Sequence, residues 1–187
     1  MRLLIIGPQG AGKGTQATLL AENLEVPHVS TGDIFRSNVG HGTELGKAAQ
    51  EYMNKGELVP DELTSAMVAA RLLEPDMVNG WLLDGFPRNL SQAKWLHDLL
   101  AERGTGLAAV LLLDAPDEVL RERMLQRGRA DDTLEAIDRR LEIYHSETKP
   151  LLDFYGDLVV PVDGVGHLQE VQHRILSALG KSDLVHG

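Results

Sequence analysis

Cysteine is absent from the 187 residues of this chain, which excludes disulfide bonds, thiolate chemistry and cysteine-bound zinc. Aromatic residues make up only 4% of the sequence, too few to build stacking platforms for nucleic-acid bases. No apolar run approaches the roughly 20 residues of a membrane-spanning helix. The apolar start meets a glycine and a proline too early for a signal peptide. We therefore expect a cytoplasmic globular protein without nucleic-acid or membrane partners.

Positive charge is also scarce, and it is unevenly placed. The net charge of −10 disfavours general binding to nucleic acid or to acidic membrane surfaces. Six of the twelve arginines nevertheless lie between Arg121 and Arg140. An acidic protein that gathers its arginines in one stretch is suited to bind a small anion there.

The most informative stretch is the glycine-rich segment from Gly7 to Thr15, GPQGAGKGT. It follows a short apolar run and precedes an amphipathic helical pattern, the context of a phosphate-binding loop. Such a loop points several backbone N–H groups at one anion, and the following helix adds its positive dipole end. Lys13 can reach the outer phosphates as a point charge. The alternative is an ordinary glycine-rich turn. Because Gly14 follows the lysine, we do not assign Thr15 as a direct magnesium ligand.

Strand-like and helical patterns alternate along the whole chain. Strands are predicted near residues 2–7, 26–30, 81–84, 107–113 and 158–162. Helices are predicted near residues 13–24, 34–39 after a cap at 31–33, 43–54, 61–73, 90–103, 116–127, 133–147 and 168–179. This alternation predicts an α/β fold: a three-layer, parallel five-stranded sheet of the P-loop NTPase type with right-handed crossovers.

One domain is expected, with two small movable parts. The core would comprise residues 1–29, 60–125 and 133–187. Residues 30–59 read as a flap of two short helices with glycines at the joints, and residues 126–132 as a short lid. Glycine joints are plausible hinges. No surface helix is unusually apolar, so a monomer is expected.

Asp84 ends a predicted buried strand, which would place it beside the phosphate loop. A carboxylate there suits Mg²⁺, either directly or through its water ligands. The alternative is an acid that only caps a turn or a helix.

The arginines of the second half are expected to converge. Arg123 and Arg127 share one helix face, Arg129 lies in the following loop, and Arg140 lies on the next helix. Planar guanidinium groups are suited to hold a transferring phosphoryl group. Any one of these arginines alone would be read as solvated surface, as we expect for Arg121 and Arg139. As a set they would repel one another without an anion between them.

No general base stands out. The histidines are scattered, and none falls in a recognisable constellation: His28, His41, His97, His145, His167, His173 and His186. Water or an alcohol would need deprotonation before attack, whereas a phosphate acceptor is already anionic. Catalysis would then depend on positioning and on charge stabilisation, with water excluded by the two movable parts.

With these residues in view, the chain resembles the adenylate kinase family over nearly its whole length. Four motifs carry the resemblance: the phosphate loop, STGDIFR at 30–36, LDGFPR at 83–88, and Arg123 with RGRADD at 127–132. Their order and spacing together are very specific. The few residues near Gly128 are similar to the short-lid form of the family, and without cysteine no zinc lid is possible.

The resemblance implies ATP, AMP and ADP as ligands and Mg²⁺ as the metal. ATP phosphates are expected at Gly10, Ala11, Gly12, Lys13, Gly14 and Thr15, and the ATP adenine at Arg127 and the backbone near Gly166. AMP is expected at Thr31, Arg36, Glu57, Leu58, Val59, Gly85, Phe86, Pro87, Arg88, Gln92, Arg129 and Arg140. The transferring phosphoryl group is expected among Lys13, Arg88, Arg123, Arg129 and Arg140, and Asp84 is expected to orient magnesium through water.

Two positions bear on the choice of acceptor. Pyrimidine-specific relatives usually carry alanine in place of Thr31 and asparagine in place of Gln92, so this chain favours adenine. Where the family often has lysine, this chain has Glu57, but the expected contact is to the backbone. Two alternatives remain: a kinase for UMP, CMP or GMP, and a binding module that closes on ATP without transferring phosphate.

Overall fold

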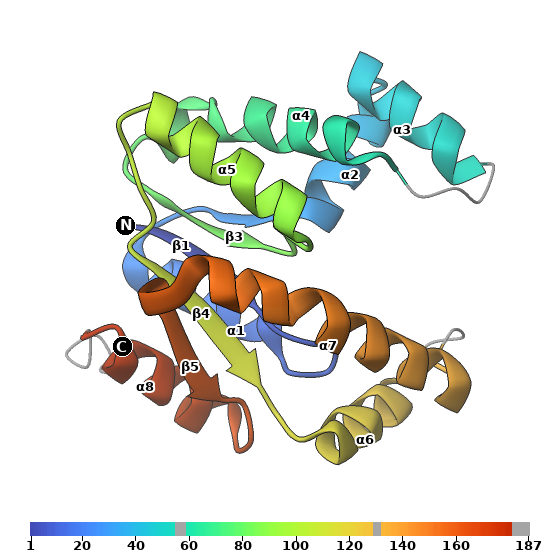
Figure 1. The fold of residues 1–187 in the computed structure, drawn as a ribbon, viewed down its shortest axis with the longest axis vertical. Helices are drawn as coiled ribbons and strands as arrows, with labels where there is room; N and C mark the ends of the chain where they lie inside the picture. The colour runs from blue at the N-terminus through green and yellow to red at the C-terminus, as the bar shows by residue number, and fades with distance from the viewer. Residues whose placement is uncertain (55–58, 129–131, 181–187) are drawn as a thin grey trace.

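The computed structural model describes residues 1–54, 59–128 and 132–180, which fold around one five-stranded sheet (Figure 1). The strands are β1 (Arg2–Ile6), β2 (His28–Ser30), β3 (Trp81–Asp84), β4 (Ala109–Asp114) and β5 (Val159–Asp163). Their spatial order is β2-β3-β1-β4-β5, and every neighbouring pair is parallel. The predicted parallel five-stranded α/β sheet is confirmed.

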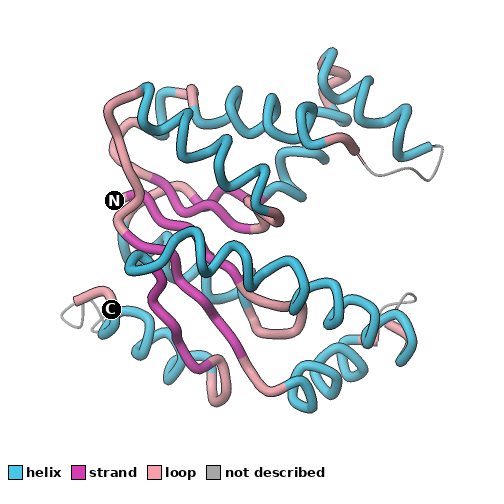
Figure 2. Tube along the Cα trace, in the orientation of Figure 1, coloured by secondary structure: helices cyan, strands magenta, loops and turns pink. Residues whose placement is uncertain are grey.

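Helices connect the strands and cover both faces of the sheet (Figure 2). They are α1 (Lys13–Leu24), α2 (Thr31–Gly40), α3 (Glu44–Asn54), α4 (Asp61–Leu72), α5 (Leu90–Glu102), α6 (Asp117–Arg127), α7 (Leu134–Tyr155) and α8 (Leu168–Ala178). Two short 3₁₀ turns, Pro75–Met77 and Gly156–Leu158, precede β3 and β5. None of the helices in the described part of the chain combines the length and apolar character that a membrane span needs.

Alternate residues of the central strands enter two separate cores. Leu3 and Ile5 of β1 pack on one face, mainly with α1, α6, α8 and the start of α7. Leu4 and Ile6 pack on the other face with α4, α5 and the end of α7. Burying one such side chain contributes about 1.5–3 kcal/mol. The central strands are therefore apolar on both sides, as a covered parallel sheet requires.

Two helices begin or end differently from the sequence prediction. Residues 31–33 were expected to cap α2, but Thr31 is already helical and the Ser30 hydroxyl accepts the Asp33 N–H at 3.4 Å. The helix predicted over 133–147 continues to Tyr155, through Pro150. Leu151 and Tyr155 are buried in the second core, so packing outweighs the helix-breaking tendency of proline. Both differences arise from contacts that lie outside a local sequence window.

Helices α6 and α7 form an antiparallel hairpin beyond the carboxyl end of β4 (Figure 1). Asp117, early on α6, contacts His145, late on α7, at 3.0 Å. Arg121, one turn further along α6, bonds Asp138, earlier on α7, at 2.6 Å. This pairing in opposite directions confirms that the two helices are antiparallel.

Helices α2 and α3 pack closely together at the other end of the molecule, next to α4. A Cβ on Gly46 would lie only 2.2 Å from the Asn38 carbonyl oxygen, so only glycine permits this approach of α3 to α2. The carboxyl ends of the strands, called the sheet edge below, thus lie between the α2–α3 pair on one side and the α6–α7 hairpin on the other.

Candidate active site

The site lies where β1, β3 and β4 end at the carboxyl edge of the sheet, the position at which open α/β sheets bind ligands. Asp84 at the end of β3 is paired in register with Ile5 of β1 and with Ser30 of β2. The phosphate loop follows β1 directly. A cleft of about 250 Å³ opens there, and its walls include Gly7, Lys13, Gly85, Arg88 and Arg140.

The phosphate loop curls tightly between β1 and α1. Gly10 and Gly12 have φ angles of 86° and 91°, which favour glycine. A Cβ on Gly7 would lie 2.2 Å from the Leu113 carbonyl oxygen, so the loop starts in close contact with β4. Helix α1 begins at Lys13. Gly12, Lys13, Gly14 and Thr15 therefore form the N-terminal end of a helix, whose N–H groups attract anions. The loop expected from the sequence is present.

Lys13 lies half-buried in this loop. Burial lowers the pKa of its ammonium group, and the nearby Arg88 lowers it further. The Asp84 carboxylate opposes this by raising the same pKa. The positive charge of Lys13 is thus only partly compensated by the protein, which favours a bound anion beside it.

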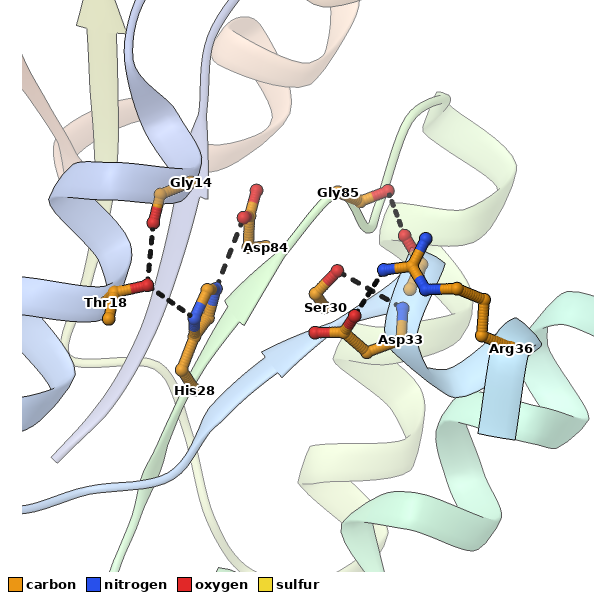
Figure 3. A network of polar contacts seen from close by, with 9 residues as sticks. Gly14, Thr18, His28, Ser30, Asp33, Arg36, Asp84 and Gly85 are labelled. Carbon is orange, nitrogen blue, oxygen red and sulfur yellow. Dashed lines mark hydrogen bonds and ion pairs between the residues drawn. The ribbon is translucent and has the colours of Figure 1, made fainter. Parts of the chain in front are cut away.

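Asp84 belongs to a short polar chain that the sequence did not indicate (Figure 3). Its Oδ2 lies 3.3 Å from His28 Nε2, and His28 Nδ1 lies 3.4 Å from the Thr18 hydroxyl. Thr18 in turn donates to the Gly14 carbonyl at 3.0 Å. The expectation that His28 belongs to no constellation was therefore wrong. Its place on a three-residue strand next to β3 decides this contact, and no local pattern could have shown it.

The surroundings of Asp84 were tested for magnesium. Its side chain is 13% exposed, and its charge acts on the lysine of the phosphate loop. Within residues 1–54, 59–128 and 132–180, no group of three His, Asp or Glu residues could hold a metal by itself. Magnesium takes few protein ligands and completes its shell with water and nucleotide phosphates. A single strand-end carboxylate fits this mode of binding.

The turn after β3 faces the start of α2 (Figure 3). Thr31 donates its hydroxyl to the Gly85 carbonyl at 3.2 Å, and Arg88 Nε donates to the same oxygen at 2.9 Å. Gly85 has a φ of 85°, and a Cβ there would lie 2.6 Å from the Thr31 hydroxyl. Arg36 forms an exposed ion pair with Asp33 one turn along α2. Four residues expected at an AMP site therefore lie close together.

Phe86, Pro87 and Gln92 complete this turn. The Phe86 ring is only 1% exposed and packs edge-on against Trp95, so this side chain belongs to the core. Pro87 lines the cleft. Gln92 is buried, and its Oε1 accepts the Arg88 backbone N–H at 2.8 Å. Because the Phe86 side chain is buried, this residue could contact a ligand only through its backbone.

Arg123 contacts the back of the phosphate loop. Its Nη1 donates to the carbonyls of Gly10 and Ala11 at 3.2 and 3.4 Å. Its Nη2 donates to Gly164, after β5, at 2.8 Å. This guanidinium joins α6 to the loop and to the end of β5, so it stabilises the loop conformation as well as adding positive charge.

Arg127 and Arg140 converge as the helix spacing predicted, but the anion between them belongs to the chain. The side chain of Asp132 is 0% exposed. Its oxygens accept from Arg127 Nε and Nη2 at 3.0 and 2.8 Å, and from Arg140 Nη1 at 2.9 Å. From the sequence, Asp132 was noted only as a member of the motif at 127–132. Its place between Arg127 of one helix and Arg140 of the next was the feature of the sequence that could have indicated these ion pairs.

The remaining expected residues lie apart from this cluster or outside the description. Val59 precedes α4 and packs partly buried against the second core. Gly166 lies in the turn before α8 with a φ of 127°, beside Glu170 and Arg174. Glu57, Leu58 and Arg129 lie outside the described residues.

Fold and site together are those of a P-loop phosphotransferase, with the phosphate loop and the turn after β3 lining one cleft. A family model described as adenylate kinase matches residues 5–159. Relatives named adenylate kinase from Rhodococcus erythropolis and Nocardia farcinica are 52% and 53% identical over 181 residues. One from Mycobacterium tuberculosis is 52% identical. Each alignment covers 97% of this chain and 100% of the relative. The chain belongs to the adenylate kinase family.

Proposed function

We propose that this enzyme transfers a phosphoryl group reversibly between magnesium-ATP and AMP, giving two molecules of ADP. One observation carries the assignment: Lys13 of the phosphate loop and Arg88 of the turn after β3 line the same cleft. Two phosphate-bearing substrates can then meet end to end between the two cations. Membership of the adenylate kinase family supports this reaction.

Each substrate has its own set of residues in this proposal. The ATP phosphates occupy the loop from Gly10 to Thr15, while Arg127 and the turn at Gly166 contact the ATP adenine. AMP occupies the other side, at Thr31, Arg36, Glu57, Leu58, Val59, Gly85, Phe86, Pro87, Arg88 and Gln92. Lys13, Arg88, Arg123, Arg129 and Arg140 stabilise the charge of the transferring group.

Magnesium neutralises the ATP phosphates when it is bound. Asp84 is the residue of this chain that would hold it, by accepting hydrogen bonds from metal-bound water. The contact with His28 at 3.3 Å helps to orient the carboxylate. The described residues would then contribute position and charge to the metal site rather than direct metal ligands.

The reaction needs no general base, because the AMP phosphate is already anionic. Its oxygen attacks the terminal phosphorus of ATP, and the leaving oxygen of ADP departs on the opposite side. Water must be excluded during this step. We assign that task to the flap of residues 30–59 and the short lid of residues 126–132.

The test is product formation from magnesium-ATP with AMP, UMP, CMP or GMP offered singly, and with no acceptor. Rapid ADP formation with AMP alone is expected, and almost none without an acceptor. Equal turnover with UMP would indicate another nucleoside monophosphate kinase. ATP binding without transfer to any acceptor would indicate a nucleotide-gated binding module, and ADP formation without acceptor would indicate an ATPase.

We also propose that the enzyme acts as a monomer in the cytoplasm, since its substrates are small nucleotides. A single species of about 20.5 kDa in size-exclusion chromatography with light scattering is the expected result.

A further inference from the structure

We infer that Asp61 is a positioning residue that fixes which way the Gln92 side-chain amide faces, and thereby sets the choice of adenine over a 6-oxopurine. The inference rests on the proposed function, in which Gln92 reads the base of AMP. It adds a residue that lies 31 positions away in the sequence and begins a different helix.

Both ends of the Gln92 amide are held by the protein. Its Oε1 accepts the Arg88 backbone N–H at 2.8 Å. Its Nε2 donates to Asp61 Oδ1 at 2.9 Å. The residue is only 6% exposed, so water does not readily replace these partners. Gln92 is thus anchored by one fixed donor and one fixed acceptor.

Reversing the amide would be costly. The NH₂ group would then face the Arg88 N–H, and the carbonyl oxygen would face the Asp61 carboxylate. Each contact would pair like with like and leave buried polar groups unsatisfied, at about 1–3 kcal/mol per group. Arg88 and Asp61 therefore select one of the two amide orientations.

Asn89 strengthens the same arrangement. Its Nδ2 donates to both Asp61 oxygens at 3.3 Å. Its Oδ1 caps α5 by accepting the Gln92 backbone N–H at 2.9 Å. The Asp61 carboxylate thus receives two side-chain amides from the start of α5, which holds the first turns of α4 and α5 together.

The selected orientation decides which base fits. An amide NH₂ carries two N–H donors and an amide oxygen two lone pairs, so one of each remains on Gln92. A donor beside an acceptor complements adenine, which presents N1 as an acceptor and its 6-amino group as a donor. Hypoxanthine and guanine present the reverse, an N1–H donor and a 6-oxo acceptor. Only a reversed amide would match them.

The experiment compares AMP with inosine monophosphate, which carries the 6-oxo edge without the extra amino group of GMP. Products are separated by anion-exchange chromatography, and kcat/KM is measured for each acceptor. Asp61→Asn replaces one acceptor oxygen by an NH₂ group at nearly constant shape. We expect the ratio of kcat/KM for AMP to that for inosine monophosphate to fall about tenfold, the effect of one hydrogen bond to a charged group.

Glu62→Gln is the matched control, because it removes a neighbouring carboxylate from the same first turn of α4. It should leave the ratio unchanged. A merely structural role of Asp61 would lower kcat/KM for both acceptors equally. An unchanged ratio in Asp61→Asn would therefore overturn the inference while leaving the proposed function intact. A wild-type enzyme that does not phosphorylate AMP would overturn both.

Folding is checked by thermal unfolding of each variant. Should Asp61→Asn fail to fold, Asp61→Ser replaces it, since serine is well tolerated in a first helical turn. The same tenfold fall in the ratio is expected there, and an unchanged ratio has the same adverse meaning.

Discussion

The cations of the sheet edge and those of the α6–α7 hairpin are held in different ways. Lys13 begins α1 after the phosphate loop, Arg88 lies in the turn after β3, and hydrogen bonds to backbone carbonyls fix that loop and that turn. Arg127 and Arg140 share the buried carboxylate of Asp132. The sheet edge therefore presents positive charge to a ligand, while the hairpin meets part of its charge internally.

This difference has an energetic consequence. Burial lowers the Lys13 pKa because it destabilises the charged ammonium group. A bound phosphate would stabilise that charge. The hairpin arginines already interact with a carboxylate, so a phosphate adds less to them. The sheet edge should supply most of the affinity for phosphates, and the hairpin should supply a contact that strengthens only as the transferring group forms. Four predictions test this comparison.

The largest effect is expected at the sheet edge, for Lys13→Met. Methionine keeps the length of the side chain but removes the charge that faces the phosphates. We expect kcat/KM to fall about a thousandfold, the upper range for removing one preorganised donor. Steady-state ADP formation measures it. A fall of less than tenfold would mean that the loop backbone alone holds the phosphates. The proposed difference between the sheet edge and the hairpin would then not hold.

Arg88→Ala tests the second of these cations, which lines the same cleft. The Gly85 carbonyl loses one of its two donors, Arg88 Nε at 2.9 Å, and the phosphoryl group loses a guanidinium. We expect turnover to drop about a hundredfold, with the protein still folded by circular dichroism. If the loss were tenfold or less, Arg88 would not belong to the phosphoryl site.

Asp132→Asn tests the hairpin. It leaves two partly buried arginines without their shared carboxylate, and we expect the free energy of unfolding to fall by about 2 kcal/mol. Asp138→Asn is the control, because its pair with Arg121 is 40% and 52% exposed. That control should cost at most about 0.5 kcal/mol. Urea denaturation compares them, and equal losses would show that Asp132 is no special anchor.

The smallest effect concerns pH. The folded-state pKa of Lys13 lies below the ordinary value of 10.5. Between these two pKa values the unfolded chain binds more protons, so this lysine makes stability rise with pH there. Lys13→Met lacks this rise. The unfolding free energy of the variant minus that of the wild type should therefore fall as pH approaches 10.5.

Taking that difference also cancels the pH dependence that the buried tyrosines give to the stability of both proteins. Burial raises the pKa of Tyr144 and Tyr155, which makes the stability of both proteins fall at high pH. A difference that stays constant from pH 7 to pH 10.5 would show that Lys13 is not desolvated. Saturating phosphate should also abolish the effect, because an anion restores the pKa of the ammonium.

Much of the fold could be predicted because its signals are local. The strand, glycine turn and helix around Lys13 follow from residue types over a short window, and the predicted sheet class is confirmed. The end of α7 could not be predicted in this way. Pro150 suggests a stop, but Leu151 and Tyr155 gain more by packing under the sheet.

Part of the site could be predicted for the same reason. Lys13 and Asp84 follow strands that the sequence marks by their apolar runs, so both were expected at one edge of the sheet. The partners of these residues could not be predicted. His28 meets Asp84 only because β2 pairs with β3, and Asp61 meets Gln92 only because α4 packs on α5.

Residue types and their spacing were enough to predict the available chemistry: a phosphate loop, a strand-end carboxylate, and a set of arginines without a general base. Which charges compensate one another depends on how the chain packs. Asp132 fills the gap between Arg127 and Arg140, while Lys13 keeps a partly uncompensated charge. The physical reason is that residue type and spacing are written along the chain, whereas burial and distance arise only when distant segments pack.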